Sequence, residues 1–213
     1  MKALFPNLFP GTSSAGRDWL DIWNLFHSYY SEVHRHYHNL NHISEMLTFR
    51  GKYIPRRDKD NKILISILFH DLIYDPQSKE NEIMSAKICS EILRDFSYPE
   101  SITKGVSDFI YSTIHHIPKP DTEEVRLFLD FDLLILGSSP ERYEEYSNSI
   151  RKEYSFVNDE DYKTGRSRIL ENFLKRDRIF FDDVIRSTYE MKARENLESE
   201  LKILTQTSRD SDQ

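Results

Sequence analysis

Several features are scarce in this chain of 213 residues, and each absence narrows what the chain can be. Cys89 is the only cysteine, so an intrachain disulfide and a zinc–thiolate cluster are both excluded. One cysteine fits a reducing compartment, and we expect a cytoplasmic protein. No run approaches the roughly 18 apolar residues of a membrane span. Pro6 and Pro10 interrupt the apolar N-terminus, which makes it a poor signal peptide.

Basic residues are also in deficit. The chain has 29 lysines and arginines against 36 aspartates and glutamates, which gives a net charge of −7. General binding to nucleic acid or to anionic membranes needs basic surface, so we expect neither partner. This charge balance still permits a small phosphorylated substrate, held by a local basic pocket or by a metal. The sequence leaves the oligomeric state open, a homodimer included.

Glycine is rare as well, and hairpin turn signals are scarce. There are six glycines, and no Asn-Gly or Asp-Gly pair lies between alternating segments. Apolar residues instead recur at helical spacing in seven segments, which are 17–31, 40–49, 80–95, 101–114, 140–155, 159–175 and 178–204. Ser139 and Pro140 mark the start of the fifth of these, as a cap and a first-turn proline.

Two further segments are apolar on nearly all sides. Residues 62–75 are typical of a fully buried helix. Residues 125–137 suit a buried strand or a buried helix, and we favour a helix because a lone strand would have no partner. We therefore predict an all-α fold, a single domain over 1–213 with about seven to nine helices. Its core spans about 17–204, and a polar tail follows at 205–213.

The segment "ILISILFHDLIYD" places His70 and Asp71 side by side in an apolar run. A buried ionised carboxylate costs several kcal/mol unless it is paired or bound to a metal. One interpretation is a hydrogen-bonded core histidine, with Asp71 paired to a distant arginine. The other is a shared cation. Adjacent helical residues point roughly 100° apart, so both would reach one ion only near their shared edge.

Histidines and acids cluster in two other segments. "VHRHYHNLNHISEML" carries His34, His36, His38 and His42. His38 and His42 share a helix face if the helix includes both; alternatively Asn39 or Asn41 caps a helix from about residue 40. "FLDFDLLILG" hides Asp130 and Asp132 in another apolar run. Binding of one common cation would explain the histidines and buried acids of all three segments. Imidazoles with carboxylates suit Mn, Fe, Ni, Co or Zn better than Ca, and an open position would activate water.

The order His, His-Asp, Asp on buried helices resembles the HD superfamily of metal-dependent phosphohydrolases. It is most similar to a subgroup of small predicted HD-type phosphohydrolases. The shared phrases cover most of residues 20–180 and are "YHNLNHI", "FHDLIYD", "NEIMSA", "TIHH", "FLDFDLLILG", "YSNSIRKEY", "GRSRIL" and "FLKR". The resemblance implies an HD-like helical bundle with one divalent ion, Mn, Fe, Ni, Co, Zn or Mg. Its implied ligands are His42, His70, Asp71 and Asp132, with Asp130 as the alternative to Asp132.

The resemblance also implies a reaction. Metal-activated water would hydrolyse a small phosphomonoester, a nucleotide or a cyclic nucleotide. Asp71 and Glu82 would act in catalysis, Glu82 as a general base or a water-orienting carboxylate. Glu82 equally suits an ordinary first-turn helix position. His116 would stabilise phosphate charge. Two-metal HD proteins usually carry a further histidine before the pair His115 and His116, and none lies at 72–114, so one metal, or one with a weakly held second, is expected.

Arginine is the natural ligand for phosphate, and we predict substrate binding by Arg35 and Arg166, with a place on a solvated face as the alternative for each. Two other functions remain open. One is a non-catalytic helical module that binds a nucleotide or a protein partner around a structural metal, with 190–202 as a candidate partner-binding helix. The other is an HD-type di-iron oxygenase, which the missing intermediate histidine disfavours.

Overall fold

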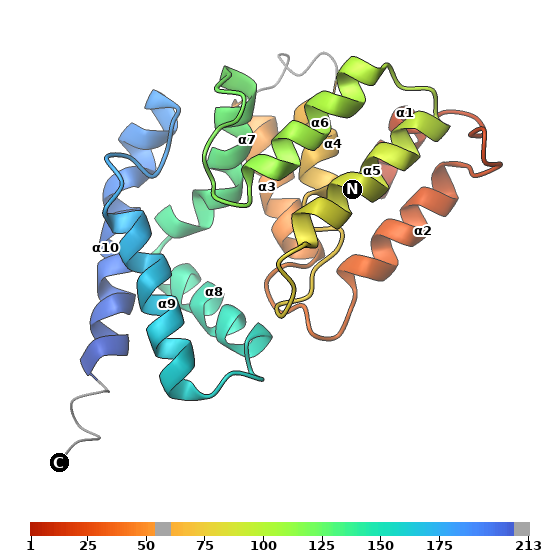
Figure 1. Cartoon of the computed structure of the whole chain (residues 1–213). Coiled ribbons are helices and arrows are strands. Elements are labelled where there is room, and N and C mark those ends of the chain that lie inside the picture. Colours follow the sequence, from red (N-terminus) through yellow and green to blue (C-terminus); the bar gives the residue numbers. More distant parts are fainter. Residues whose placement is uncertain (54–60, 207–213) are drawn as a thin grey trace. The chain divides into compact units, whose positions relative to one another are not determined.

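The computed structural model describes residues 1–53 and 61–206, and within these ranges the chain is all-helical (Figure 1). The described residues form ten α-helices and two short 3₁₀-helices, without a strand. This confirms the predicted all-α fold. The ambiguous segment 125–137 is helical, as α7 (Glu123–Leu133) followed by η2 (Leu134–Gly137). The predicted polar tail lies outside the described residues from position 207.

The chain separates into two compact units, Met1–Phe131 and Asp132–Gln213. The boundary falls inside α7, so the last turn of this helix belongs to the second unit while its backbone continues unbroken from the first. The predicted single domain stays a prediction. Of the helices in the described part, none is both long and apolar enough to cross a membrane.

The first unit is built around α4 (Lys62–Phe69), where every residue from Ile63 to Phe69 is buried. The other elements of this unit are η1 (Lys2–Leu4), α1 (Phe5–Leu8), α2 (Trp19–Tyr30), α3 (Leu40–Tyr53), α5 (Asn81–Asp95), α6 (Glu100–Ser112) and most of α7. Helices α3, α5 and α6 pack against α4, which explains why its sequence is apolar on all sides. The N-terminal segment belongs to the same core, since Phe9 contacts Phe69.

Helix α4 ends at Phe69, so the predicted helix over 62–75 is wrong in its last part. The N–H of His70 donates to the carbonyl of Ser66 at 2.9 Å, and the N–H of Leu72 then reaches only three residues back, to Phe69 at 3.2 Å. Such tightening is common at a helix end. His70 and Asp71 consequently lie in the turn after a buried helix. Their side chains are therefore not held at the angle of roughly 100° that separates adjacent residues within a helix.

The second unit contains η2, α8 (Pro140–Glu153), α9 (Asp159–Leu174) and α10 (Asp183–Gln206). The start of α8 is as predicted, with the Ser139 hydroxyl accepting the N–H of Arg142 and Pro140 in the first turn. Helix α10 packs against α9 and η2. It begins at Asp183 rather than at residue 178, because the Glu190 carboxylate takes the N–H groups of Ile179 and Phe180 ahead of the helix.

Candidate metal centre

His42 lies in the first turn of α3. The side-chain oxygen of Asn39 accepts the N–H of Asn41 at 2.9 Å, so the asparagine caps a helix that begins at Leu40. This confirms one of the two alternatives for this segment, since His38 precedes the helix. The His42 side chain is buried and its ring lies against that of Tyr37, with 4.9 Å between the ring centroids.

His70 follows α4 and is also buried. Its Nδ1 lies 3.1 Å from the carbonyl oxygen of Ile67. A carbonyl can only accept, so Nδ1 carries the hydrogen and the neutral ring presents the Nε2 lone pair on its other side. A backbone acceptor behind one ring nitrogen is the usual way in which a metal-binding histidine is oriented.

Asp132 comes from the last turn of α7. One turn earlier on the same helix, Phe128 packs edge-on against the His70 ring, with 5.8 Å between the centroids. Residues four apart share a helix face, so this contact directs Asp132 toward His70. Asp130 lies two positions back, on the opposite side of the helix, and is fully buried. The geometry therefore supports Asp132 over Asp130 as the candidate ligand.

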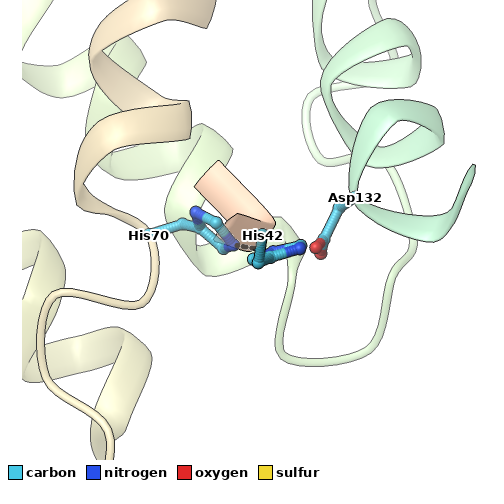
Figure 2. A group of neighbouring side chains, drawn as sticks. All are labelled: His42, His70 and Asp132. Carbon is cyan, nitrogen blue, oxygen red and sulfur yellow. Dashed lines mark hydrogen bonds between the residues drawn. The ribbon is translucent and has the colours of Figure 1, made fainter. Parts of the chain in front are cut away.

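The candidate ligands converge. One ligand atom each from His42, His70 and Asp132 lies within 4.8 Å of the other two, and the group could hold a metal ion. Figure 2 shows the three side chains pointing toward one another, and the Nε2 atoms of the two histidines are 3.4 Å apart. Asp71 joins them, with its Oδ2 3.0 Å from the Nε2 of His70 and 3.9 Å from that of His42. The structure thus groups three of the four residues expected to bind a metal, and Asp71 lies beside the two histidines of that group.

The chemistry of this donor set fits a divalent ion. The facing atoms of two imidazoles and two carboxylates are mostly hydrogen-bond acceptors. A single proton between them can form a hydrogen bond within only one pair of these groups. A cation satisfies them together and offsets the cost of burying the carboxylates. Two nitrogens with two oxygens suit a first-row transition ion better than Ca²⁺, and the set accepts Mn, Fe, Ni, Co or Zn.

Arg35 was expected to bind substrate phosphate, and its position indicates another role. Its side chain is fully buried. The guanidinium donates to the backbone carbonyls of Asp71 at 2.7 Å and Leu72 at 2.8 Å. It also donates to the carbonyl of His38 at 3.1 Å and, through Nε, to the Glu32 carboxylate at 2.9 Å. The donors of Arg35 are therefore directed at the backbone that carries the candidate ligands.

Arg166, the second arginine expected to bind phosphate, lies within the second unit on α9. It is buried and forms a two-pronged ion pair with Glu200 of α10, at 2.8 and 2.9 Å. Glu200 also accepts from the Tyr143 hydroxyl at 2.5 Å and from the Ser147 hydroxyl at 2.9 Å. Burial acts to raise the pKa of Glu200, but the hydrogen bonds and charge of Arg166 hold it below its ordinary value.

The two remaining predicted catalytic residues lie on separate elements. Glu82 is half-buried in the first turn of α5. His116 is half-buried in the turn after α6, where its backbone has a φ of 48°, in the left-handed region. Their catalytic roles stay predictions.

Sequence reasoning missed two features of these regions. One is the fork that Arg35 makes with the His-Asp turn, and the other is the buried partnership of Arg166 with Glu200. A local signal exists for neither, because the partners lie 36 and 34 residues apart. The half-buried His38 ring also lies close to Tyr74, with 4.3 Å between the centroids, and 6.0 Å from the His42 ring.

Comparisons with protein-family models, with curated proteins and with solved structures find no match to this chain.

Proposed function

We propose that this chain is a metal-dependent phosphohydrolase of the HD type. Its substrate would be a small phosphomonoester, a nucleotide or a cyclic nucleotide. The observation that carries the proposal is the meeting of His42, His70 and Asp132 within 4.8 Å, with Asp71 3.0 Å from His70. These four residues are also those that occupy the ordered His, His-Asp, Asp pattern of the sequence.

Burial divides the four ligands into a floor and a rim. The side chains of His42 and His70 are 2% and 1% exposed, whereas that of Asp71 is 17% exposed and Asp132 is half-buried. The histidines are therefore shielded from water, and in this proposal substrate would reach the site from the side of the more exposed carboxylates. A bound divalent ion would supply Lewis-acid activation of water and stabilise charge developing on the phosphoryl group.

The chain's own groups have defined tasks in this proposal. The Ile67 carbonyl holds His70 in one tautomer, and Phe128 fixes the face from which Asp132 reaches the site. Glu82 orients the attacking water or removes its proton, and His116 offsets phosphate charge. Phosphate binding by Arg35 and Arg166 is not part of the proposal, because both guanidinium groups donate to acceptors of the chain itself.

Cys89 has no place in the chemistry. It is a free, buried cysteine, and burial raises the pKa of its thiol far above the ordinary value. A buried neutral thiol is neither a nucleophile nor a metal ligand. The proposed cytoplasmic location rests on this single unpaired cysteine.

Metal analysis followed by a phosphoester panel tests the proposal. The purified chain is expected to hold close to one equivalent of a first-row metal and to hydrolyse at least one phosphomonoester, nucleotide or cyclic nucleotide. Asp71→Ala is expected to abolish both metal and turnover. Asp108→Ala is the matched control, since Asp108 pairs with exposed Lys104 on α6 and should change neither.

Other outcomes point to other functions. A chain that retains metal but cleaves no member of the panel would contradict the phosphohydrolase, and nucleotide stabilisation without turnover would then favour a binding module. Iron with an absorbance change on oxygenation would favour an oxygenase. Turnover that survives Asp71→Ala would show that the site is misassigned.

A further inference from the structure

We infer that Arg35 is a positioning residue of the metal centre, one that sets the geometry of the ligands without touching the ion. The inference rests on the proposed metal-dependent function. The planar guanidinium of Arg35 forms hydrogen bonds to both backbone segments that carry His42 and Asp71.

The hydrogen bonds of Arg35 reach both segments at once. On one side, Nη1 donates to the carbonyl of His38, four residues before His42. On the other side, Nη1 donates to the carbonyl of Asp71 itself and Nη2 to that of Leu72. The carbonyls of His38 and Asp71 are therefore held by one nitrogen, Nη1, while Nη2 of the same planar group holds that of Leu72. A shift of either segment would break bonds that are 2.7–3.1 Å long.

The carbonyls of Asp71 and Leu72 belong to the turn that directly follows α4, near the carboxyl end of that helix. A cation is favoured at this end because the helix dipole is negative there. Glu32 balances the buried charge, with its carboxylate 2.9 Å from Nε of Arg35. The tight turn that lets His70 and Asp71 face one point is thus capped by Arg35.

These contacts require the shape of an arginine side chain and not only its positive charge. Its fork offers five donors in one plane, and four of them have acceptors at this position. The guanidinium also lies 4.9 Å from the ring centroid of Tyr30 and 5.5 Å from that of Tyr74. A lysine would keep the charge but would place it at one point and lose the link between the segments.

The far side of the turn is tied down independently. The Ser85 hydroxyl accepts the N–H of Ile73 at 2.9 Å, and Asp75 exchanges two hydrogen bonds with the Asn81 side chain. Loss of Arg35 would therefore not release the whole loop. It would release the half that carries Asp71, which makes ligand geometry the property to measure.

Arg194 provides a matched control. It also donates to two backbone carbonyls, those of Leu174 at 3.1 Å and Arg176 at 2.8 Å, and to a glutamate on its own helix, Glu190. It lies within the second unit. Replacing Arg194 therefore removes the same kind of fork from backbone at 174–176, which carries none of the candidate ligands.

The test uses the full chain with Co²⁺ as the probe. Co²⁺ affinity is measured by titration calorimetry, the ligand field by the visible absorption of the bound ion, and folding by urea denaturation. Arg35→Met and Arg35→Lys are each expected to weaken Co²⁺ binding by about 10–100-fold and to change the visible spectrum, as for other residues that orient metal ligands. Arg194→Met and Arg194→Lys are expected to keep both affinity and spectrum.

The outcomes separate this inference from the function on which it rests. A wild-type chain that binds no Co²⁺ overturns the metal centre and this role with it. A wild-type chain that binds Co²⁺, together with an Arg35→Lys variant of unchanged affinity and spectrum, overturns the positioning role alone. Arg35→Lys keeps the buried charge, so it decides the question even if Arg35→Met does not fold. Equal losses in the Arg194 variants would also overturn the role, since they would reflect general destabilisation.

Discussion

Two aspartates on α7 show how a difference of two positions separates a candidate ligand from a core residue. Asp132 lies with His42 and His70, whereas Asp130 is fully buried on the other side of the helix. Asp132→Asn removes a charge from the site and is expected to lower Mn²⁺ affinity at least about tenfold, because a coordinating oxygen loses its charge. Asp130→Asn is expected to leave Mn²⁺ affinity unchanged. Titration calorimetry of both variants checks the pair, and the reverse order would move the ligand to Asp130.

Ser66 is a second residue with a distinct expectation. It lies in α4 one turn before His70 and is fully buried, and its hydroxyl has no hydrogen-bond partner among the described residues. A buried hydroxyl without a partner has lost its hydrogen bonds to water, and no hydrogen bond within the protein replaces them. Ser66→Ala should therefore raise the free energy of unfolding by about 1 kcal/mol, measured by urea denaturation of the metal-free chain. Destabilisation would mean that the hydroxyl has a partner after all, such as a buried water.

At the scale of elements, α8, α9 and α10 are joined through one carboxylate. Glu200 of α10 binds Arg166 of α9 and accepts from Tyr143 and Ser147 of α8. Removing one member of a buried ion pair strands the charge of the other and costs about 3–5 kcal/mol. Glu200→Gln is expected to destabilise the chain by this order at neutral pH. The control is Glu198→Gln, an exposed glutamate of the same helix, which should stay within about 0.5 kcal/mol of wild type.

The same carboxylate predicts a pH dependence. The folded pKa of Glu200 lies below the ordinary value of 4.5, so its contribution is complete above that pH. It is lost as the pH falls below 4.5 and through the folded pKa, where the native carboxylate must take up a proton. The stability difference between wild type and Glu200→Gln should therefore be constant at neutral pH and shrink in acid. A difference that grows as the pH falls would contradict the sign of this shift.

The sequence is informative about elements wherever local periodicity decides them. The helices at α2, α3, α5, α6, α8 and α9 follow from apolar residues at helical spacing and from caps such as Ser139. The end of α4 at Phe69 does not follow from local periodicity, and the carbonyls of Asp71 and Leu72 just beyond it accept from Arg35, which lies far away in the sequence. The same reasoning applies to the site. Its polar residues stand out within apolar runs, whereas Arg35, which binds the turn that carries Asp71, lies 36 residues from Asp71.

At the scale of the whole molecule, the tryptophans lie in the unit that holds most of the candidate metal ligands. Both tryptophans, Trp19 and Trp23, are on α2, and Trp23 contacts Phe5 and Phe26 in the core of the first unit. Three of the four candidate ligands belong to this unit, and the fourth continues its helix α7. Tryptophan fluorescence therefore reports unfolding of the unit in which the metal is proposed to bind.

This arrangement predicts a metal-dependent thermal transition. An ion at 100 times its Kd stabilises the state that binds it by about 2.7 kcal/mol. For a chain of this length such a gain corresponds to a rise in Tm of roughly 5–10 °C. Chelated protein is expected to melt at the lower temperature by tryptophan fluorescence, and added Mn²⁺ or Co²⁺ should restore the higher one. Asp71→Ala should melt at the same temperature with and without metal, because one ligand is gone. A shift that persists in Asp71→Ala would place the bound ion elsewhere, and no shift in wild type would argue against the centre itself.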